Sequence, residues 1–139
     1  MIKTKLRIIA DPRMVNDSTL MTALSEWNWF VNSKKFLWFV LFKKKRWVAY
    51  GALSLYDSST VYFGPDFVVE PARGHRLQQK LIKKREKWAR KQGYKVVLVV
   101  VEPGNVSSAN NYIRCGYALR EAWLGFGQND KYLWFTKEL

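Results

Sequence analysis

The sequence predicts a single α/β domain with a mixed, mostly antiparallel sheet, one parallel crossover and flanking helices. Three apolar and aromatic stretches, at 36–42, 47–55 and 60–69, are separated only by short polar turns, as expected for a strand meander. A segment with helical spacing follows, and then Val96–Val101, in which every residue is valine or leucine. Such a run is typical of a buried strand, and a strand reached through a helix is usually parallel to the one before it.

The elements before the crossover follow from the periodicity of their apolar residues. Residues 5–10 predict a first strand that ends at Asp11-Pro12. Between residues 17 and 31, Leu20, Leu24 and Trp27 recur at helical spacing, and Asp17 or Ser18 is a suitable N-cap. The three meander strands come next, joined by turns at 43–45 and 57–59.

The elements after the meander place the candidate site. A basic helix is expected to begin near Arg73 and to stop at Gly93, with Leu77, Leu81 and Trp88 on its apolar face. A short helix at 107–114 and an antiparallel strand pair at 117–126 and 131–136 complete the chain. Ligands favour the carboxyl ends of strands where the connection pattern of a sheet changes. The turns at 69–74 and 102–105 lie at that point, so we expect a ligand there.

Composition limits the possible classes of protein. The 139 residues leave room for one domain, and 48% hydrophobic residues are too many for a disordered chain. The net charge of +13 attracts phosphates, nucleic acid or anionic cofactors. No apolar run reaches the roughly 18–20 residues of a membrane-spanning helix. The single cysteine, Cys115, excludes an internal disulfide and offers no metal cluster. We therefore expect a soluble cytoplasmic protein without a metal or a membrane partner.

The first chemically informative segment is 69–79, where a strand leads through a tight turn into the basic helix. The first N–H groups of a helix lack intrahelical partners and can bind phosphate, aided by the helix dipole. Arg73, His75 and Arg76 add positive charge at the same place. From residue 73 to residue 95 there are ten Lys or Arg residues and one acid, Glu86. Taken alone, this run favours a solvated cationic helix face.

The second informative segment is 105–117, which follows the buried strand and begins with Asn105 as a helix cap. Tyr112 lies on the short helix, where its hydroxyl can face the end of the crossover helix. Taken alone, Tyr112 is typical of a core aromatic residue with a hydrated hydroxyl.

Together, in this order and strand pattern, the two segments resemble the GNAT (N-acetyltransferase) superfamily. The acetyl-CoA signature of that family is Arg/Gln-x-x-Gly-x-Gly/Ala, and its three specified positions are held here by Arg73, Arg76 and Gln78. Both glycines are thus replaced, at positions where glycine permits close approach of the backbone to pyrophosphate.

The later family signature is fully kept in its spacing. It consists of an asparagine, a tyrosine seven residues further on, and then glycine followed by an aromatic residue; these are Asn105, Tyr112 and Gly116-Tyr117. The resemblance covers nearly the whole chain in element order and residues 67–117 at the level of motifs.

The resemblance implies that residues 1–139 form one N-acetyltransferase domain with acetyl-CoA as co-substrate. The two central strands would splay apart, with the pantetheine arm between them. A primary amine would attack the thioester directly, an N–H of Phe67 or Val68 would stabilise the oxyanion, and Tyr112 would protonate the thiolate as general acid. The implied cofactor-binding residues are Phe67, Val68, Val69, Arg73, Gly74, His75, Arg76, Leu77, Gln78, Gln79, Asn105 and Tyr112.

The general base and the acceptor pocket are less determined. Glu102, Asp66 and Glu70 are the nearby acids, with Tyr62 as a further candidate; Glu102 is preferred because it follows the central strand, and a relayed water can also accept the proton. The first helix, its following loop and the last strand pair would wall the acceptor pocket. Its candidate aromatic residues are Trp27, Trp29, Phe30, Tyr56, Trp123 and Phe126.

Other readings of the sequence remain open. The high charge is consistent with a basic nucleic-acid-associated GNAT-like protein, which would modify an amine on DNA, RNA or a ribosomal protein, or would bind without catalysis. No known nucleic-acid-binding motif is present. The sequence does not separate a toxin-like or drug-modifying acetyltransferase from the first hypothesis, and it permits a monomer or a homodimer.

Overall fold

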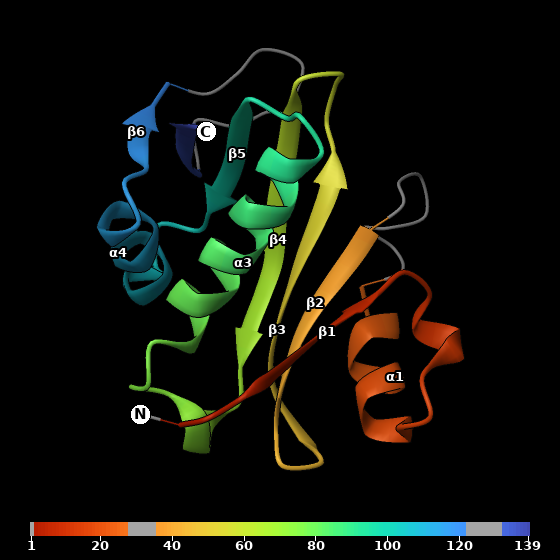
Figure 1. Ribbon diagram of the computed structural model, residues 1–139. Helices are drawn as coiled ribbons and strands as arrows, with labels where there is room; N and C mark the ends of the chain where they lie inside the picture. Colours follow the sequence, from red (N-terminus) through yellow and green to blue (C-terminus); the bar gives the residue numbers. More distant parts are fainter. Residues whose placement is uncertain (1, 28–35, 122–131) are drawn as a thin grey trace.

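The structure, a computed structural model, describes residues 2–27, 36–121 and 132–139. Within these residues, strands form one sheet in the order β1-β2-β3-β4-β5-β7-β6 (Figure 1). The strands are β1 (Lys5–Ile9), β2 (Phe36–Lys43), β3 (Arg46–Leu55), β4 (Thr60–Val68), β5 (Val96–Val101), β6 (Ala118–Arg120) and β7 (Leu133–Glu138). The helices are α1 (Ser18–Ser25), α3 (Leu77–Lys91) and α4 (Val106–Arg114), with 3-10 turns η1 (Pro12–Met14) and η2 (Glu70–Ala72).

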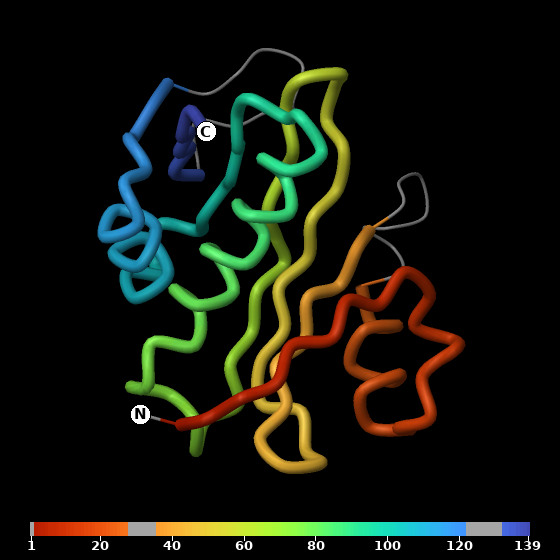
Figure 2. The backbone as a smooth tube through the Cα atoms, viewed as in Figure 1, coloured from red at the N-terminus to blue at the C-terminus, as the bar shows by residue number. Residues whose placement is uncertain are grey.

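The sheet has the mixed topology that the sequence predicts. Strands β1 to β4 are antiparallel neighbours, β5 is parallel to β4, and β7 is antiparallel to both β5 and β6. The crossover from β4 to β5 runs through α3, which lies across the sheet beside α4 (Figures 1 and 2). The predicted parallel crossover is therefore confirmed.

Alternation along the strands gives each face of the sheet its own core. On one face, Phe39, Leu41 and Leu53 pack with Leu81 and Ile82 of α3. On the other face, the alternate residues Trp38, Val40 and Tyr50 pack with Leu20 and Leu24 of α1. Because successive side chains of a strand point to opposite faces, α3 and α1 lie on opposite sides of the sheet.

Helix α1 is shorter than the sequence predicts. Asp17 caps it, accepting hydrogen bonds from the backbone N–H groups of Thr19 and Leu20 at 3.1 and 3.2 Å. The helix ends at Ser25 and not at residue 31, and Trp27 lies beyond its C-cap at Glu26. Residues 28–35, which include Trp29 and Phe30, lie outside the described part of the chain.

Helix α3 begins at Leu77 and not near Arg73. Pro71 has no N–H to contribute to a ladder, and the 3-10 turn η2 occupies residues 70–72. Gly74 has φ 86° and Arg76 has φ 58°, so the chain makes two left-handed residues before the helix can start. The last strand pair is confirmed over 118–120 and 134–136, whereas residues 122–131, with Trp123 and Phe126, lie outside the described residues.

Strands β4 and β5 diverge. They pair only over Thr60–Phe63 and Val96–Val99, whereas β4 continues to Val68, paired with β3 alone. One side of β4 from about residue 64 onward is therefore without a neighbouring strand among the described residues. None of the helices that the structure describes is long and apolar enough to span a membrane.

Candidate active site

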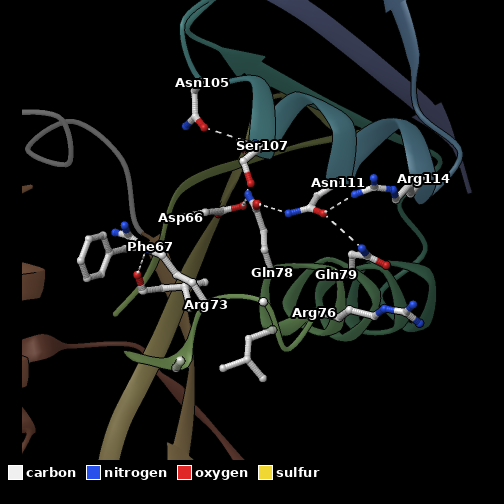
Figure 3. Close-up of a pocket in the computed structure, with 15 residues that line it drawn as sticks. Asp66, Phe67, Arg73, Arg76, Gln78, Gln79, Asn105, Ser107, Asn111 and Arg114 are labelled. Atoms are coloured by element: carbon white, nitrogen blue, oxygen red, sulfur yellow. Dashed lines mark hydrogen bonds between the residues drawn. The ribbon is translucent and has the colours of Figure 1, made fainter. Parts of the chain in front are cut away.

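A cavity of about 870 Å³ lies where β4 leaves β5, between the start of α3 and the helix α4 (Figure 3). It forms at the end of the divergence, because no strand of the described residues fills the open side of β4 there. The residues that line it are Asp66, Phe67, Val68, Ala72, Arg73, Gly74, Arg76, Leu77, Gln78, Gln79, Asn105, Ser107, Ser108, Asn111 and Arg114.

The start of α3 gives this cavity an anion-binding wall. Arg76, the N-cap, makes no side-chain capping bond, and within the described residues no protein acceptor meets the first N–H groups, those of Leu77, Gln78 and Gln79. Unsatisfied N–H groups at a helix start attract anions. The positive charges of Arg73, Arg76 and Arg114 line the same cavity. The wall is therefore suited to a phosphate or diphosphate.

The free side of β4 offers backbone groups to the cavity. The Val69 N–H donates to the Val48 carbonyl at 2.9 Å, and the pairs Phe67–Tyr50 and Val68–Ala49 follow in register. Antiparallel ladders alternate, so a bond from Val69 to β3 directs the backbone groups of Val68 away from β3. Arg73 Nε already donates to the Val68 carbonyl at 3.0 Å. Val68, more than Phe67, therefore presents its amide to the open side.

Gln78, which stands at a signature glycine position, bridges three elements across the cavity wall. Its Nε2 donates to Asp66 Oδ2 at 3.0 Å and to Ser108 Oγ at 2.9 Å, and its Oε1 accepts from Asn111 Nδ2 at 2.8 Å (Figure 3). Gln79 Nε2 also donates to Asn111 Oδ1, at 3.1 Å. The replacement of glycine thus ties α3 to β4 and α4.

A buried ionic network closes the cavity behind Asp66. Arg85, which is fully buried, donates to both carboxylate oxygens of Asp66 at 2.7 and 2.9 Å and to the Ala52 carbonyl at 2.8 Å. The Tyr112 hydroxyl donates to Asp66 Oδ2 at 2.5 Å. The Cβ of any residue larger than Gly51 would lie 2.8 Å from Arg85 Cζ, so glycine makes room for this guanidinium.

The network fixes the protonation of its members. Burial raises the pKa of Tyr112 well above its usual value, and the charge of Asp66 adds to that rise, which the charge of Arg85 only partly offsets. Burial alone would lower the pKa of Arg85, but the charge of Asp66, the hydrogen bond to Asp66 and the interactions with Tyr112 and Tyr117 together outweigh it, so the pKa rises. Tyr112 is therefore a neutral hydroxyl at neutral pH, and Arg85 stays charged.

The structure brings together most of the predicted cofactor-binding residues. Those that line the cavity are Phe67, Val68, Arg73, Gly74, Arg76, Leu77, Gln78, Gln79 and Asn105. Asn105 is the N-cap of α4, where its Oδ1 accepts from the Ser108 N–H at 3.2 Å.

Four predicted residues do not line the cavity. Val69 is turned to β3, and His75 is exposed beside the turn. Glu102, the preferred base, is exposed on the turn after β5, because the side chain that follows the buried strand emerges into solvent. Tyr112 is 1% exposed and lies behind Asp66.

Sequence reasoning missed Arg85, Ser108 and Asn111. The basic run at 73–95 predicts that Arg85 is solvated like the other charges of the helix. It lies four residues after Leu81 and four before Ala89, and both of these are buried. Its place within the apolar stripe was the available signal.

The described aromatic candidates for the acceptor pocket lie in different parts of the structure. Trp27 lines a second cavity, on the α1 face of the sheet. Tyr56 packs elsewhere, with Tyr62 and Leu98. No cluster of metal-ligating side chains occurs among the residues with described positions.

Comparison with protein families matches residues 5–117 to the acetyltransferase (GNAT) family. The match covers most of the chain, so this protein belongs to the GNAT family of acetyltransferases and is an acyltransferase. A search of curated proteins finds no relative.

Solved structures agree with this fold. A Klebsiella pneumoniae protein assigned as an acyl-CoA N-acyltransferase has a TM-score of 0.79 at 19% identity, covering 98% of this chain and 97% of the other. An IAA acetyltransferase from Bacillus cereus has a TM-score of 0.76 at 16% identity, covering 99% and 100%. A Bacillus subtilis acetyltransferase in complex with CoA has a TM-score of 0.76 at 10% identity, covering 99% of each chain.

Proposed function

We propose that this protein is an N-acetyltransferase that moves an acetyl group from acetyl-CoA to a primary amine by direct attack. The observation that carries the proposal is the cavity at the diverging end of β4, which combines free helix N–H groups, three arginines and an open strand side. The similar Bacillus subtilis acetyltransferase has CoA in its structure, which supports the choice of co-substrate.

Each part of the cavity suits one part of acetyl-CoA. The N–H groups at the start of α3, with Arg73, Arg76 and Arg114, would hold the diphosphate. The backbone of Val68 would bond the pantetheine arm and direct an N–H to the oxyanion. Acetyl-CoA supplies a thioester, and during transfer its C–S bond and one amine N–H bond are exchanged for an amide C–N bond and a thiol S–H bond.

Tyr112 is the proposed proton donor to the departing thiolate. The raised pKa keeps its proton in place at neutral pH. Its hydroxyl donates to Asp66, which lines the cavity, so the proposed role requires the hydroxyl to turn from Asp66 toward the sulfur atom when the co-substrate is bound. Asp66, the one acid on the cavity wall among the described residues, then loses a donor and can accept the proton of the attacking ammonium through a relayed water.

Calorimetry with acetyl-CoA at moderate salt, followed by a mass-spectrometric screen of amine acceptors, tests the function. We expect saturable binding and a mass increase of one acetyl group on at least one amine. Arg73→Gln should weaken acetyl-CoA binding. The control is Arg13→Gln, which removes an exposed arginine that pairs with Asp11 and does not line the cavity; this change should leave binding unaltered. Undetectable binding of acetyl-CoA would overturn the proposal.

The outer side of α3 supports a second candidate function, association with a polyanion such as nucleic acid. Its exposed cations are Lys83, Lys87, Arg90 and Lys91. A protein that neutralises several phosphates loses affinity steeply as salt rises, and the slope reports their number. A salt titration of DNA or RNA binding tests this candidate, and no binding even at low salt would exclude it.

A further inference from the structure

A second cavity, of about 570 Å³, lies on the α1 face of the sheet. Its wall consists of Ser18, Thr19, Thr22, Ala23, Glu26, Trp27, Trp47, Tyr50 and Phe67. Its volume is within the range of small-molecule sites. Phe67 lines this cavity and also the first cavity, in which acetyl-CoA is proposed to bind and which is called the cofactor cavity below. The two cavities therefore meet at β4 from opposite sides of the sheet.

The walls of the second cavity are aromatic. Tyr50 and Phe67 stack with ring centroids 5.6 Å apart, and Trp47 stands 5.9 Å from Tyr50 and 6.4 Å from Phe67. Hydrogen bonds fix the rings: Trp27 Nε1 donates to the Tyr50 hydroxyl at 2.8 Å, and Trp47 Nε1 donates to Thr19 Oγ1 at 3.1 Å. The rings are therefore held in place before any ligand arrives.

The charge of this wall is opposite to that of the whole chain. In a protein of net charge +13, the one charged side chain among the described residues of this wall is the carboxylate of Glu26. Burial raises the pKa of Tyr50, and the negative charges of Glu26 and Asp66 raise it further against the opposing bond from Trp27. The wall of the cavity thus combines the Glu26 carboxylate with aromatic rings.

Aromatic faces together with a carboxylate recognise an organic cation. Phe67 already has the Arg73 guanidinium 5.9 Å from its ring centroid, which leaves Trp47 and Glu26 as the principal partners of a cationic ligand in the second cavity. A ligand that also carried a carboxylate would meet the charge of Glu26. The chemistry selects a cationic amine with an apolar body and no acidic group.

We propose that this cavity is the acceptor site and that it selects small cationic amines with an apolar body, bound by Trp47 and Glu26. The proposal rests on the acetyltransferase function proposed above. Since Phe67 lies between the two cavities, an amine bound here approaches the thioester from the face of the sheet opposite to α3.

The first experiment measures ligand binding and does not require acetyl transfer. Phenethyltrimethylammonium, a quaternary amine that cannot be acetylated, is titrated by calorimetry against the protein and its variants. We expect saturable binding that weakens about tenfold in Glu26→Gln and in Trp47→Leu. Matched controls are Glu138→Gln, an exposed acid on β7, and Trp88→Leu, a half-buried tryptophan on the α3 face; both should bind as the unaltered protein does.

The second experiment compares acceptors in the transfer reaction. Phenethylamine and phenylalanine differ by one carboxylate, and we expect kcat/KM for phenethylamine to be at least tenfold higher. Glu26→Gln should reduce that preference by raising KM for phenethylamine, with kcat and the acetyl-CoA affinity unchanged. A capped lysine peptide that is acetylated without competition from phenethyltrimethylammonium would overturn the assignment.

The outcomes separate the two proposals. Quaternary-amine binding that depends on Glu26 and Trp47, without any acetyl-CoA binding, would support the cation site and overturn the transferase function. Acetyl transfer to amines that is insensitive to both variants would support the function and overturn the acceptor site. Equal binding of phenethyltrimethylammonium and of the neutral phenethyl alcohol would also overturn the site.

Discussion

At the scale of single residues, Arg76 holds a conformation that suits glycine. Its φ of 58° is left-handed, which destabilises the folded state by about 1–2 kcal/mol for a residue with a Cβ. A glycine at this position costs about 0.5–1 kcal/mol instead, because glycine has more conformational freedom to lose when the chain folds. We expect Arg76→Gly to raise Tm by about 2 °C. The same change should weaken acetyl-CoA binding, because the cavity loses a cation. Calorimetric scanning and titration measure the two effects.

Gly74→Ala provides the comparison for that prediction. Its φ of 86° is left-handed too, and nothing lies within 4 Å of an added Cβ, so strain alone should lower its Tm. A lower Tm for Arg76→Gly would show that the left-handed arginine is not strained.

Tyr112 is the residue on which the proposed chemistry depends most. Tyr112→Phe should lower kcat by about 100-fold or more, the usual contribution of a positioned acid, and leave the acetyl-CoA affinity within about twofold. The hydroxyl does not line the cavity and in the proposed role turns to the sulfur atom alone, a weak acceptor, so its loss removes at most one weak contact of the bound co-substrate. Steady-state kinetics and calorimetry together measure the split.

Tyr117→Phe is the matched control. Its hydroxyl is also buried, but it donates to Glu86 Oε2 at 2.8 Å, away from the cavity wall. If Tyr117→Phe and Tyr112→Phe reduce kcat equally, the effect of Tyr112 is one of packing and the acid role fails.

At the scale of elements, Arg85 of α3 and Asp66 of β4 join the crossover helix to the strand it follows. Arg85 is 0% and Asp66 9% exposed in its side chain. Removing one partner of a buried pair costs roughly 3–5 kcal/mol, since it leaves the other charge uncompensated. We expect Asp66→Ala to lower the free energy of unfolding, measured by urea denaturation, by this amount. The double variant Asp66→Ala with Arg85→Met should lose clearly less than the sum of the losses of the two single variants.

Arg90→Met is the control for this pair. Arg90 is 50% exposed and stands 4.0 Å from Glu86, so its loss should change stability by less than about 0.5 kcal/mol. Additive effects of Asp66→Ala and Arg85→Met would mean that the two charges do not stabilise each other.

The elements also show what the sequence could predict. Strand β5 was predicted to the residue, because an uninterrupted apolar run between polar turns has one plausible reading. The start of α3 was misplaced by four residues, since two left-handed residues delay the helix. The pair Arg85–Asp66 was not predicted, because spacing shows that Arg85 faces the core but not which acid it meets there. Likewise, the sequence places Glu102 directly after β5, as the structure does. Whether its side chain faces the cavity or solvent depends on tertiary packing, which spacing in the sequence does not show.

At the scale of the whole molecule, the charge of +13 is divided between two surfaces with different roles. Arg73, Arg76 and Arg114 line the cofactor cavity, whereas Lys83 and Lys87 lie exposed further along α3. Charges in contact with a ligand affect its affinity, while distant charges act mainly on the rate of encounter and are screened beyond about 10 Å at 0.1 M salt.

This division predicts two salt responses. Lys83→Gln with Lys87→Gln should slow acetyl-CoA association at low salt and lose its effect by about 0.5 M salt, where the Debye length is only a few Å. Arg114→Gln should weaken binding at every salt concentration, because the lost charge stands on the cavity wall. Stopped-flow association rates and equilibrium titrations between 0.05 and about 0.5 M salt would measure both.

For a nucleic acid lying along α3 the ranking reverses, with the lysine pair reducing the salt slope by about two and Arg114→Gln having little effect. The order of the two variants therefore tells whether the surplus positive charge steers a small co-substrate or holds a polymer.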